Sequence, residues 1–225
     1  MDTGEPKTWK RQRPFKIDPS KRLSPEEVYL MASQMSDPCL KSLFALTYIS
    51  GCRISELIRY DKLHFDTETY TNEKGKIRTR YLWKSKQIIE SHPSILKKQL
   101  QFVMEEDTPV LLISIRNLKN RTRHIKEIPI NLSKEWNIKF VEIIKEYISS
   151  KQPDEELFPL SRNQVEYRFR KLPFNLHYLR DLRATHYAVF NDMSEGQLTR
   201  IMGWTDSRPA STYIQYKWKD LVKKT

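Results

Sequence analysis

Residues suited to chemistry on a phosphate group stand in a fixed order along this chain. Arg53 comes first, and His177 and Arg180 lie three residues apart near the C-terminus. Tyr213 follows Trp204 by nine residues. In an in-line displacement at phosphorus the negative charge spreads over the non-bridging oxygens, which guanidinium groups and an imidazole can bind in a fixed geometry. A tyrosine hydroxyl can attack the phosphorus and hold the cut strand as a covalent ester. The pattern predicts phosphoryl transfer by a tyrosine nucleophile, and this chemistry needs no metal or other cofactor.

The sequences of these segments resemble the motifs of the tyrosine recombinase (phage integrase) family, which includes integrases of viruses and plasmids. Those motifs read T-G-x-R-x-x-E-L, a lysine on a β-hairpin, H-x-L-R, G-H/W and Y. This chain has SGCRISEL over 50–57, Lys119, HYLR over 177–180, GW over 203–204 and Tyr213. The resemblance covers about residues 23–216, essentially the catalytic domain of the family. It implies an α+β fold that is mainly helical, with a small antiparallel β-sheet or hairpin.

The resemblance also implies an activity and its partners. Such enzymes cut double-stranded DNA to a 3′-phosphotyrosine and a free 5′-OH, and the 5′-OH of another strand then attacks the phosphotyrosine. The expected function is site-specific DNA recombination, for integration or excision of a mobile element or viral genome, by a protein that self-associates into a synaptic tetramer on DNA. The expected catalytic residues are Arg53, Lys119, His177, Arg180, Trp204 and the nucleophile Tyr213.

Two of these assignments have a close competitor. Lys119 is expected to protonate the leaving 5′ oxygen, but counting back from Pro129 the common family spacing lands nearer Arg121. An arginine cannot lose a proton at any useful pH, so it is the poorer general acid. Tyr213 has the family distance from the tryptophan and is the preferred nucleophile, whereas Tyr216 lies three residues later.

Structural roles are the alternative for the other residues. Arg53 could simply pair with Glu56 on its own helix, and His177 could be a histidine at the edge of the core. Trp204 has only its Nε1–H donor, so it can donate to the phosphate or pack against the tyrosine but cannot move a proton. Asp181 stands where many relatives carry histidine, a departure that affects an accessory proton relay and not the phosphate clamp.

The charge of the chain favours a nucleic-acid partner. With 40 Lys and Arg against 28 Asp and Glu, the formal net charge is +12 and the pI is about 9.6. Such a charge is typical of proteins that displace counterions from a phosphate backbone. Residues 116–126 hold five basic residues and no acid, although charge clusters are often only solvated faces. The expected DNA contacts in this segment are Arg116, Arg121, Arg123 and Lys126.

Other features predict an intracellular protein. No apolar run approaches the about 18 residues of a membrane span, and the N-terminus has no apolar h-region of a secretory signal. The two cysteines, Cys39 and Cys52, lack the spacing of a zinc site or a disulfide framework. We therefore expect a cytoplasmic, DNA-associated protein.

The expected domain organisation is a flexible basic arm over residues 1–22 and one catalytic domain over 23–225. Family members usually clamp DNA with an additional N-terminal core-binding domain, which is expected to be absent here. Lys119 lies 66 residues beyond Arg53, farther than in relatives. This distance predicts an insertion over about 67–108, built from a hairpin and an amphipathic helix at 88–104.

Capping residues and periodicity predict the surrounding elements. Ser24 and Asp37 precede prolines and should start the first two helices. Gly51 should end the second of them. A third helix is predicted over 54–60, strands over 109–115 and 123–130, and further helices over 133–149, over 164–172, from about 177, and over 195–202.

Three other functions fit parts of this pattern. A type IB topoisomerase uses the same chemistry without strand exchange, but the motif spelling is integrase-like. The presence of Tyr213 with both arginines argues against a catalytically silent DNA-binding relative. A basic RNA-binding protein is the third alternative, and it predicts no effect of Tyr213→Phe.

Overall fold

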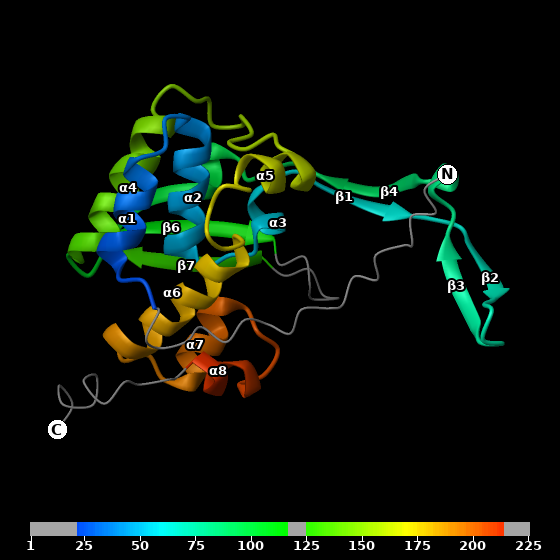
Figure 1. The fold of residues 1–225 in the computed structure, drawn as a ribbon. Coiled ribbons are helices and arrows are strands. Elements are labelled where there is room, and N and C mark those ends of the chain that lie inside the picture. The colour runs from blue at the N-terminus through cyan, green and yellow to red at the C-terminus, as the bar shows by residue number, and fades with distance from the viewer. Residues whose placement is uncertain (1–21, 117–124, 214–225) are drawn as a thin grey trace.

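The computed structural model describes residues 22–116 and 125–213 of the chain (Figure 1). For Tyr213 only the backbone is described. The predicted site residues Lys119, Arg121 and Arg123 lie outside the described residues, as do Tyr216 and residues 1–21 of the predicted arm.

Two capped helices begin the described part of the chain. α1 (Pro25–Ser33) starts at Ser24, whose hydroxyl accepts the Glu27 N–H at 3.2 Å while Glu27 Oε2 accepts the Ser24 N–H at 2.6 Å. This reciprocal capping box satisfies two N–H groups that the helix itself leaves unpaired. α2 (Pro38–Ser50) starts at Asp37, whose carboxylate accepts two backbone N–H groups of the first turn. Both predicted helix starts are confirmed.

α2 is the central helix of the molecule. Its residues 42–50 are all buried, and α1, α4 (Glu135–Ile148) and α6 (His177–Phe190) pack around it (Figure 1). Burial on all sides explains why the second half of α2 has no polar face. Gly51 ends α2 with a φ of 61°, as predicted, in the left-handed conformation that disfavours residues with a Cβ.

An antiparallel sheet of strand order β5-β6-β7 lies beside α2 and α3. Its strands are β5 (Leu100–Glu105), β6 (Thr108–Arg116) and β7 (Ile125–Asn131). Buried and exposed residues alternate along β7, and Ile113 stands opposite Ile128 in the core. One face of the sheet therefore belongs to the core. The strand predicted at 109–115 is confirmed, and so is the described part, 125–130, of the strand predicted at 123–130.

The amphipathic helix predicted over 88–104 is wrong. That stretch contains β4 (Gln87–His92), the 3-10 turn η3 (Lys97–Gln99) and most of β5. Pro93 lacks an N–H and disfavours helical geometry in the residue before it. The backbone on either side pairs instead with strands outside the stretch, β4 with β1 and β5 with β6.

The third helix is also shorter than predicted. α3 covers only Ile54–Leu57, and from Tyr60 the chain continues as β1 (Tyr60–His64), which pairs antiparallel with β4. The local sequence could not indicate this change, because the partner strand lies far along the chain and supplies the backbone hydrogen bonds.

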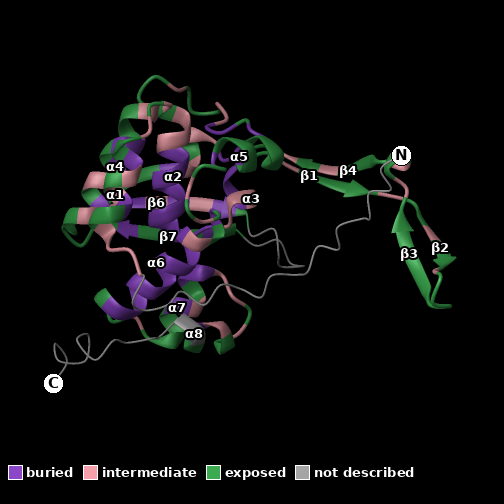
Figure 2. Ribbon diagram, viewed as in Figure 1, coloured by how far each residue is buried: buried purple, intermediate pink, exposed green. Residues whose placement is uncertain are grey.

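β1 and β4 form a two-stranded ladder that leads away from the body of the molecule (Figure 1). At its far end lies a hairpin of β2 (Thr67–Thr71) and β3 (Ile77–Tyr81), followed by the 3-10 turn η2 (Trp83–Ser85). Most residues of the ladder and hairpin are exposed (Figure 2). The region predicted as an insertion, 67–108, thus runs from the hairpin into β5 of the main sheet.

Three helices complete the described chain: α5 (Arg162–Arg168), α7 (Glu195–Met202) and α8 (Arg208–Tyr213). α5 is shorter than predicted, and α7 ends at Gly203 as predicted. The core joins α2, α4 and α6 to the sheet (Figure 2). Phe44, Tyr48 and Phe140 are fully buried in it. Helices around a small antiparallel sheet confirm the predicted α+β fold class. Among the described residues, no helix is both long enough and apolar enough to cross a membrane.

Candidate active site

Arg53 is the N-cap residue of α3 and comes two residues after the left-handed turn at Gly51. Its Nη1 donates to Glu56 Oε1 at 3.0 Å, and its backbone N–H donates to Glu56 Oε2 at 2.9 Å. The pairing with Glu56 that the sequence left open is therefore present. It does not bury the arginine, because the Arg53 side chain is 21% exposed. Glu56 fixes a guanidinium group that still reaches solvent.

Glu56 is the buried centre of a group of positive charges. Its side chain has no exposed surface, and Lys126 Nζ lies 3.6 Å from its Oε2. Burial alone would raise the pKa of Glu56, but the charges of Lys126, Arg53 and Arg180 outweigh burial and lower the pKa. Glu56 is therefore ionised at neutral pH and offsets the charges of the cations around it.

Lys126, which the sequence predicts as a DNA contact, does not lie at the surface. It shares the inner face of β7 with Ile128 and Ile130. Its side chain is only 7% exposed. Its ammonium group has no hydrogen-bond partner among the described residues, so the ion pair with Glu56 is what compensates its burial. Lys126 thus supports Glu56 and, through Glu56, the position of Arg53.

Arg180 joins two turns that are distant in the sequence. Its Nη1 donates to the carbonyl oxygen of Gly51 at 2.5 Å, and its Nη2 donates to that of Met202 at 2.7 Å. Gly51 precedes Arg53 by two residues, and Met202 precedes Trp204 by two. The Arg180 residue is 3% exposed. A planar guanidinium group presents its two Nη donors to the two carbonyls in a rigid geometry, whereas lysine carries a single compact ammonium group on a flexible chain.

The close approach of these turns requires the glycine at position 51. A Cβ built on Gly51 would come within 3.0 Å of Met202 Sδ, in addition to the strain of a positive φ. Gly51 therefore serves the site in two ways: it ends α2, and it lets the end of α7 approach the turn that carries Arg53.

His177 is the first residue of α6 and is exposed. Its Nε2 lies 3.6 Å from Oδ1 of Asp181, one turn further along the helix. Asp181 is buried, and its carboxylate is the acidic group one turn below the imidazole ring.

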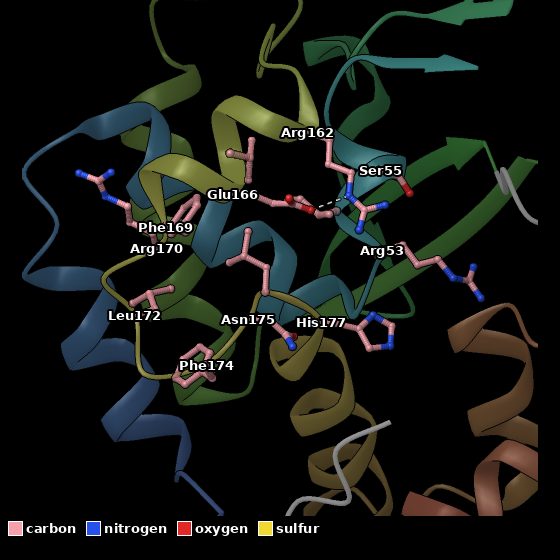
Figure 3. Close-up of a pocket in the computed structure, with 13 residues that line it drawn as sticks. Arg53, Ser55, Arg162, Glu166, Phe169, Arg170, Leu172, Phe174, Asn175 and His177 are labelled. Carbon is pink, nitrogen blue, oxygen red and sulfur yellow. Dashed lines mark hydrogen bonds and ion pairs between the residues drawn. The ribbon is translucent and has the colours of Figure 1, made fainter. Parts of the chain in front are cut away.

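A cavity of about 550 Å³ opens beside His177, between α3, α5 and the loop before α6 (Figure 3). Three arginines, Arg53, Arg162 and Arg170, are among its lining residues, together with His177. Glu166 also lines it and pairs with Arg162 at 2.7 Å. The structure therefore brings Arg53 and His177 to one cavity. A concave site with this lining suits an anionic ligand such as a phosphodiester.

Trp204 and α8 are close to the helix that carries Arg180. Trp204 packs against the core, and the centre of its ring is 6.0 Å from Arg180 Cζ, within reach of a cation–π contact. α8 packs against α6 and α7, and it ends at Tyr213. The backbone of the predicted nucleophile thus belongs to a helix that rests on the helix of His177 and Arg180.

Arg116, the first of the expected DNA contacts, is exposed at the end of β6. Its Nη1 lies 2.7 Å from Nδ1 of His92 at the end of β4. Arg116 therefore stands where the projecting ladder leaves the body of the molecule. The other expected contacts, Arg121 and Arg123, and the expected general acid Lys119 lie outside the described residues.

His186, on the buried side of α6, has a structural role. Its Nε2 lies 3.0 Å from the carbonyl oxygen of Leu23, and because a carbonyl only accepts, Nε2 carries the proton. Its Nδ1 then accepts from the Tyr48 hydroxyl at 2.7 Å. Burial, with the nearby charge of Arg183, lowers the pKa of His186 to about 3. This histidine is neutral and fully used in the core, so it is not a proton shuttle.

Sequence reasoning missed two groups of residues at this site. The inward position of Lys126, and with it the buried pair with Glu56, could have been found from the sequence. Lys126, Ile128 and Ile130 stand at every second position, and residues two apart on a strand lie on the same face. Arg162 and Arg170 belong to no recognisable motif, and only the folded structure, which lines the cavity with residues of α3, α5 and the following loop, brings them there.

Among solved structures, the chain is similar to recombinases. The crystal structure of XerA recombinase has 14% sequence identity and a TM-score of 0.48, over 95% of this chain and 64% of that chain. A pre-cleavage complex of the XerH site-specific recombinase with difH substrate has 12% identity and a TM-score of 0.48, over 89% of this chain and 51% of the other. The Tn1549 transposon integrase in complex with transposon right end DNA has 17% identity and a TM-score of 0.45, over 92% and 65%.

This chain spans between half and two thirds of the length of those proteins. No family model and no curated protein matches the sequence. The solved structures named here, to which this chain is similar, are thus two recombinases and a transposon integrase.

Proposed function

We propose that this protein is a tyrosine-type site-specific DNA recombinase that cuts and rejoins DNA strands through a 3′-phosphotyrosine, for integration or excision of a mobile element. The observation that carries the proposal is the position of the Arg180 guanidinium group, bound to the carbonyls of both Gly51 and Met202. These two bonds hold the turn of Arg53 and the turn of Trp204 against the helix of His177. This arrangement supports the proposal, because a phosphate clamp requires donors from distant segments to be held in fixed positions.

In the proposed reaction, Arg53, Arg180 and His177 hydrogen-bond the non-bridging oxygens of the scissile phosphate. Guanidinium and imidazole donors held in place by the protein stabilise the charge that develops there, at little cost of reorganisation. Trp204 adds its Nε1–H or packs against the nucleophile. Positioning of Arg53 depends on Glu56, which binds both its side chain and its backbone.

The Tyr213 hydroxyl then attacks phosphorus and loses its proton. A bond forms between the tyrosine oxygen and phosphorus, while the bond from phosphorus to the 5′ oxygen breaks. The leaving 5′ oxygen takes a proton, for which we propose Lys119, with Arg121 as the less suitable neighbour. Attack by the 5′-OH of another strand reverses these steps and restores a phosphodiester.

The proposed partners follow from this reaction. Exchange of strands requires two duplexes and several copies of the protein in one assembly, so we propose a synaptic tetramer on double-stranded DNA. The net charge of +12 suits a polyanionic partner. A DNA substrate also implies an intracellular, DNA-associated location.

The test of this function is strand cleavage with a defined polarity. The protein would be incubated with nicked duplexes that carry randomised flanks, in the presence of a metal chelator, and covalent protein–DNA adducts would be isolated under denaturing conditions. We expect an adduct that blocks the 3′ end and leaves a 5′ end that a polynucleotide kinase can label directly.

Plasmid relaxation and duplex binding, measured beside adduct formation, separate the alternative functions. Relaxation of supercoiled plasmid without joining of strands from two duplexes would indicate a topoisomerase. Binding of duplex DNA without any adduct would indicate a catalytically silent DNA-binding protein.

A further inference from the structure

The hairpin of β2 and β3 has two chemically different faces. Its register pairs Glu68 with Arg80 and Tyr70 with Arg78. Residues directly opposite in an antiparallel pair share a face, and successive residues alternate between faces. One face therefore carries these two pairs, and Lys76 continues it at the turn. The opposite face carries Thr67, Thr69, Thr71, Ile77, Thr79 and Tyr81.

The first of these faces is cationic, and we call Lys76, Arg78 and Arg80 together with Tyr70 the basic face. Glu68 is the only carboxylate in the two strands, and it pairs with Arg80. The Arg80 guanidinium also lies 5.6 Å from the centre of the Tyr70 ring. Between residues 66 and 86 there are six basic residues, Lys74, Lys76, Arg78, Arg80, Lys84 and Lys86, against three acids, Asp66, Glu68 and Glu73.

The basic face is open to solvent. All residues of β3 are exposed, and so are all of β2 except Glu68, which is partly exposed (Figure 2). The hairpin stands at the end of the β1–β4 ladder, away from the helices of the body (Figure 1). A two-stranded hairpin by itself is marginally stable in water. Its exposed position and its cations indicate a surface that binds a partner.

We propose that the β2–β3 hairpin inserts its basic face into the major groove of DNA beside the cleavage site. The major groove, about 12 Å wide, admits a two-stranded β-ribbon. Arginine can reach guanine edges or phosphates from such a ribbon, and the charge of the basic face is complementary to DNA. This inference rests on the proposed DNA substrate, but it does not require that cleavage occurs.

The length of the arm limits how far from the cleavage site the hairpin can bind DNA. β1 starts three residues after α3, which follows Arg53, so the arm is anchored next to the proposed phosphate clamp. Strands rise about 3.3 Å per residue, so β1 and β2, with five residues each, reach up to roughly 33 Å. One helical turn of DNA is about 34 Å. The hairpin would therefore extend the protected DNA by at most about one turn.

The test compares the removal of two charges from the hairpin with the same removal elsewhere. Lys76→Ala with Arg78→Ala changes the basic face, and Lys134→Ala with Lys145→Ala is the matched control. Both control lysines are exposed, one capping α4 and one within it, in a helix that lies across the body from the hairpin (Figure 1). Binding to a 40-base-pair duplex would be measured by fluorescence anisotropy at several salt concentrations, and hydroxyl-radical footprints would be recorded.

We expect the hairpin variant to bind several-fold more weakly than the wild type. If both residues contact phosphates, the slope of log K against log salt should decrease by about 1.8, since each contact contributes about 0.9. The footprint should shorten by up to one turn on one side only. The control should keep the wild-type footprint and change the slope less.

Equal slopes and footprints in the hairpin variant and the control would overturn the inference. If the wild type still formed its tyrosine adduct in that case, the proposed function would stand and only the role of the hairpin would fall. A wild type that bound no duplex at all would remove both. The alternative partner of the hairpin is a second copy of this chain, bound through the face that carries Ile77 and Tyr81. The double variant Ile77→Ser with Tyr81→Ser tests it by size-exclusion chromatography with light scattering. A change of oligomeric state with unchanged DNA binding would also overturn the inference.

Discussion

Lys126 Nζ lies 3.6 Å from Glu56 Oε2, and both side chains are almost completely withdrawn from solvent. The same carboxylate binds the side chain and the backbone of Arg53. A charged group on the inner face of the sheet thus reaches the proposed phosphate clamp through one intermediate residue. This relationship makes the position of Arg53 dependent on a buried ion pair.

Glu56→Gln should therefore affect both stability and cleavage. Removing one partner of a buried ion pair leaves the other charge uncompensated, which costs about 3–5 kcal/mol. We expect the free energy of unfolding to fall by an amount of this order, measured by urea denaturation. Cleavage should also slow, because an amide binds Arg53 less strongly than a carboxylate does.

Lys126→Met provides the control for this prediction. It removes the buried ammonium group and leaves Glu56 paired with Arg53, so it should destabilise the protein less than Glu56→Gln does. In the double variant, Lys126→Met should recover part of the stability lost in Glu56→Gln. Simple addition of the two losses would contradict the proposed coupling.

A second prediction contrasts the two arginines. Arg53→Ala should reduce cleavage by about 10²–10³, as for loss of a donor to a transition-state oxyanion. Its effect on stability should be small, because the side chain is partly exposed. Arg180→Ala should reduce both cleavage and stability, because it leaves two buried carbonyl oxygens without their donor. Measured cleavage rates and unfolding free energies that fell in parallel for both variants would contradict this division of roles.

A lysine at position 180 tests whether charge alone or the geometry of the guanidinium group is needed there. Arg180→Lys keeps the charge but loses the planar fork that binds the carbonyls of Gly51 and Met202. We expect it to cleave nearly as poorly as Arg180→Ala. Wild-type cleavage by Arg180→Lys would show that charge alone is sufficient at this position.

A third prediction concerns acid stability. The pKa of His186 is lowered to about 3 in the folded protein, whereas an unfolded histidine has a pKa of about 6.5. Below about pH 6.5 the unfolded state binds a proton that the folded state does not. The stability associated with neutral His186 is therefore complete above that pH and is lost progressively as the pH falls toward 3, by at most about 1.4 kcal/mol per pH unit.

Urea unfolding at pH 7.5 and at pH 5.0 measures this effect. His186→Gln cannot titrate, so it should be less stable than the wild type at pH 7.5 but should lose less stability on acidification. Equal losses in the wild type and in His186→Gln would mean that another group is responsible.

The local parts of the fold could be predicted from the sequence. Ser24, Asp37 and Gly51 mark helix ends because capping and left-handed turns depend on the residue itself. The strands on either side of residues 117–124 follow from β-branched residues. The pairing of β4 with β1 and of β5 with β6 could not be predicted, because the apolar residues of 88–104 fit a helix as well as strands and only distant partners decide between them.

The same distinction applies to the candidate site. Motif spacing singled out Arg53, His177, Arg180 and Trp204 as candidates. The contacts around them, such as the bonds from Arg180 to two carbonyls, are contained in no local pattern. Lys126 was predicted at the surface because of its charge, although its position two and four residues before Ile128 and Ile130 indicated the buried face. The catalytic roles of all six residues, Arg53, Lys119, His177, Arg180, Trp204 and Tyr213, remain predictions.

Identification of the tyrosine that becomes linked to DNA tests the central claim most directly. The wild type, Tyr213→Phe and Tyr216→Phe would be incubated with the nicked, flank-randomised duplexes, and each adduct would be digested with nuclease and protease and sequenced by mass spectrometry. We predict a nucleotide on Tyr213 in the wild type and in Tyr216→Phe, and no adduct in Tyr213→Phe. An adduct that persists in Tyr213→Phe, or DNA binding without any adduct in the wild type, would contradict the account.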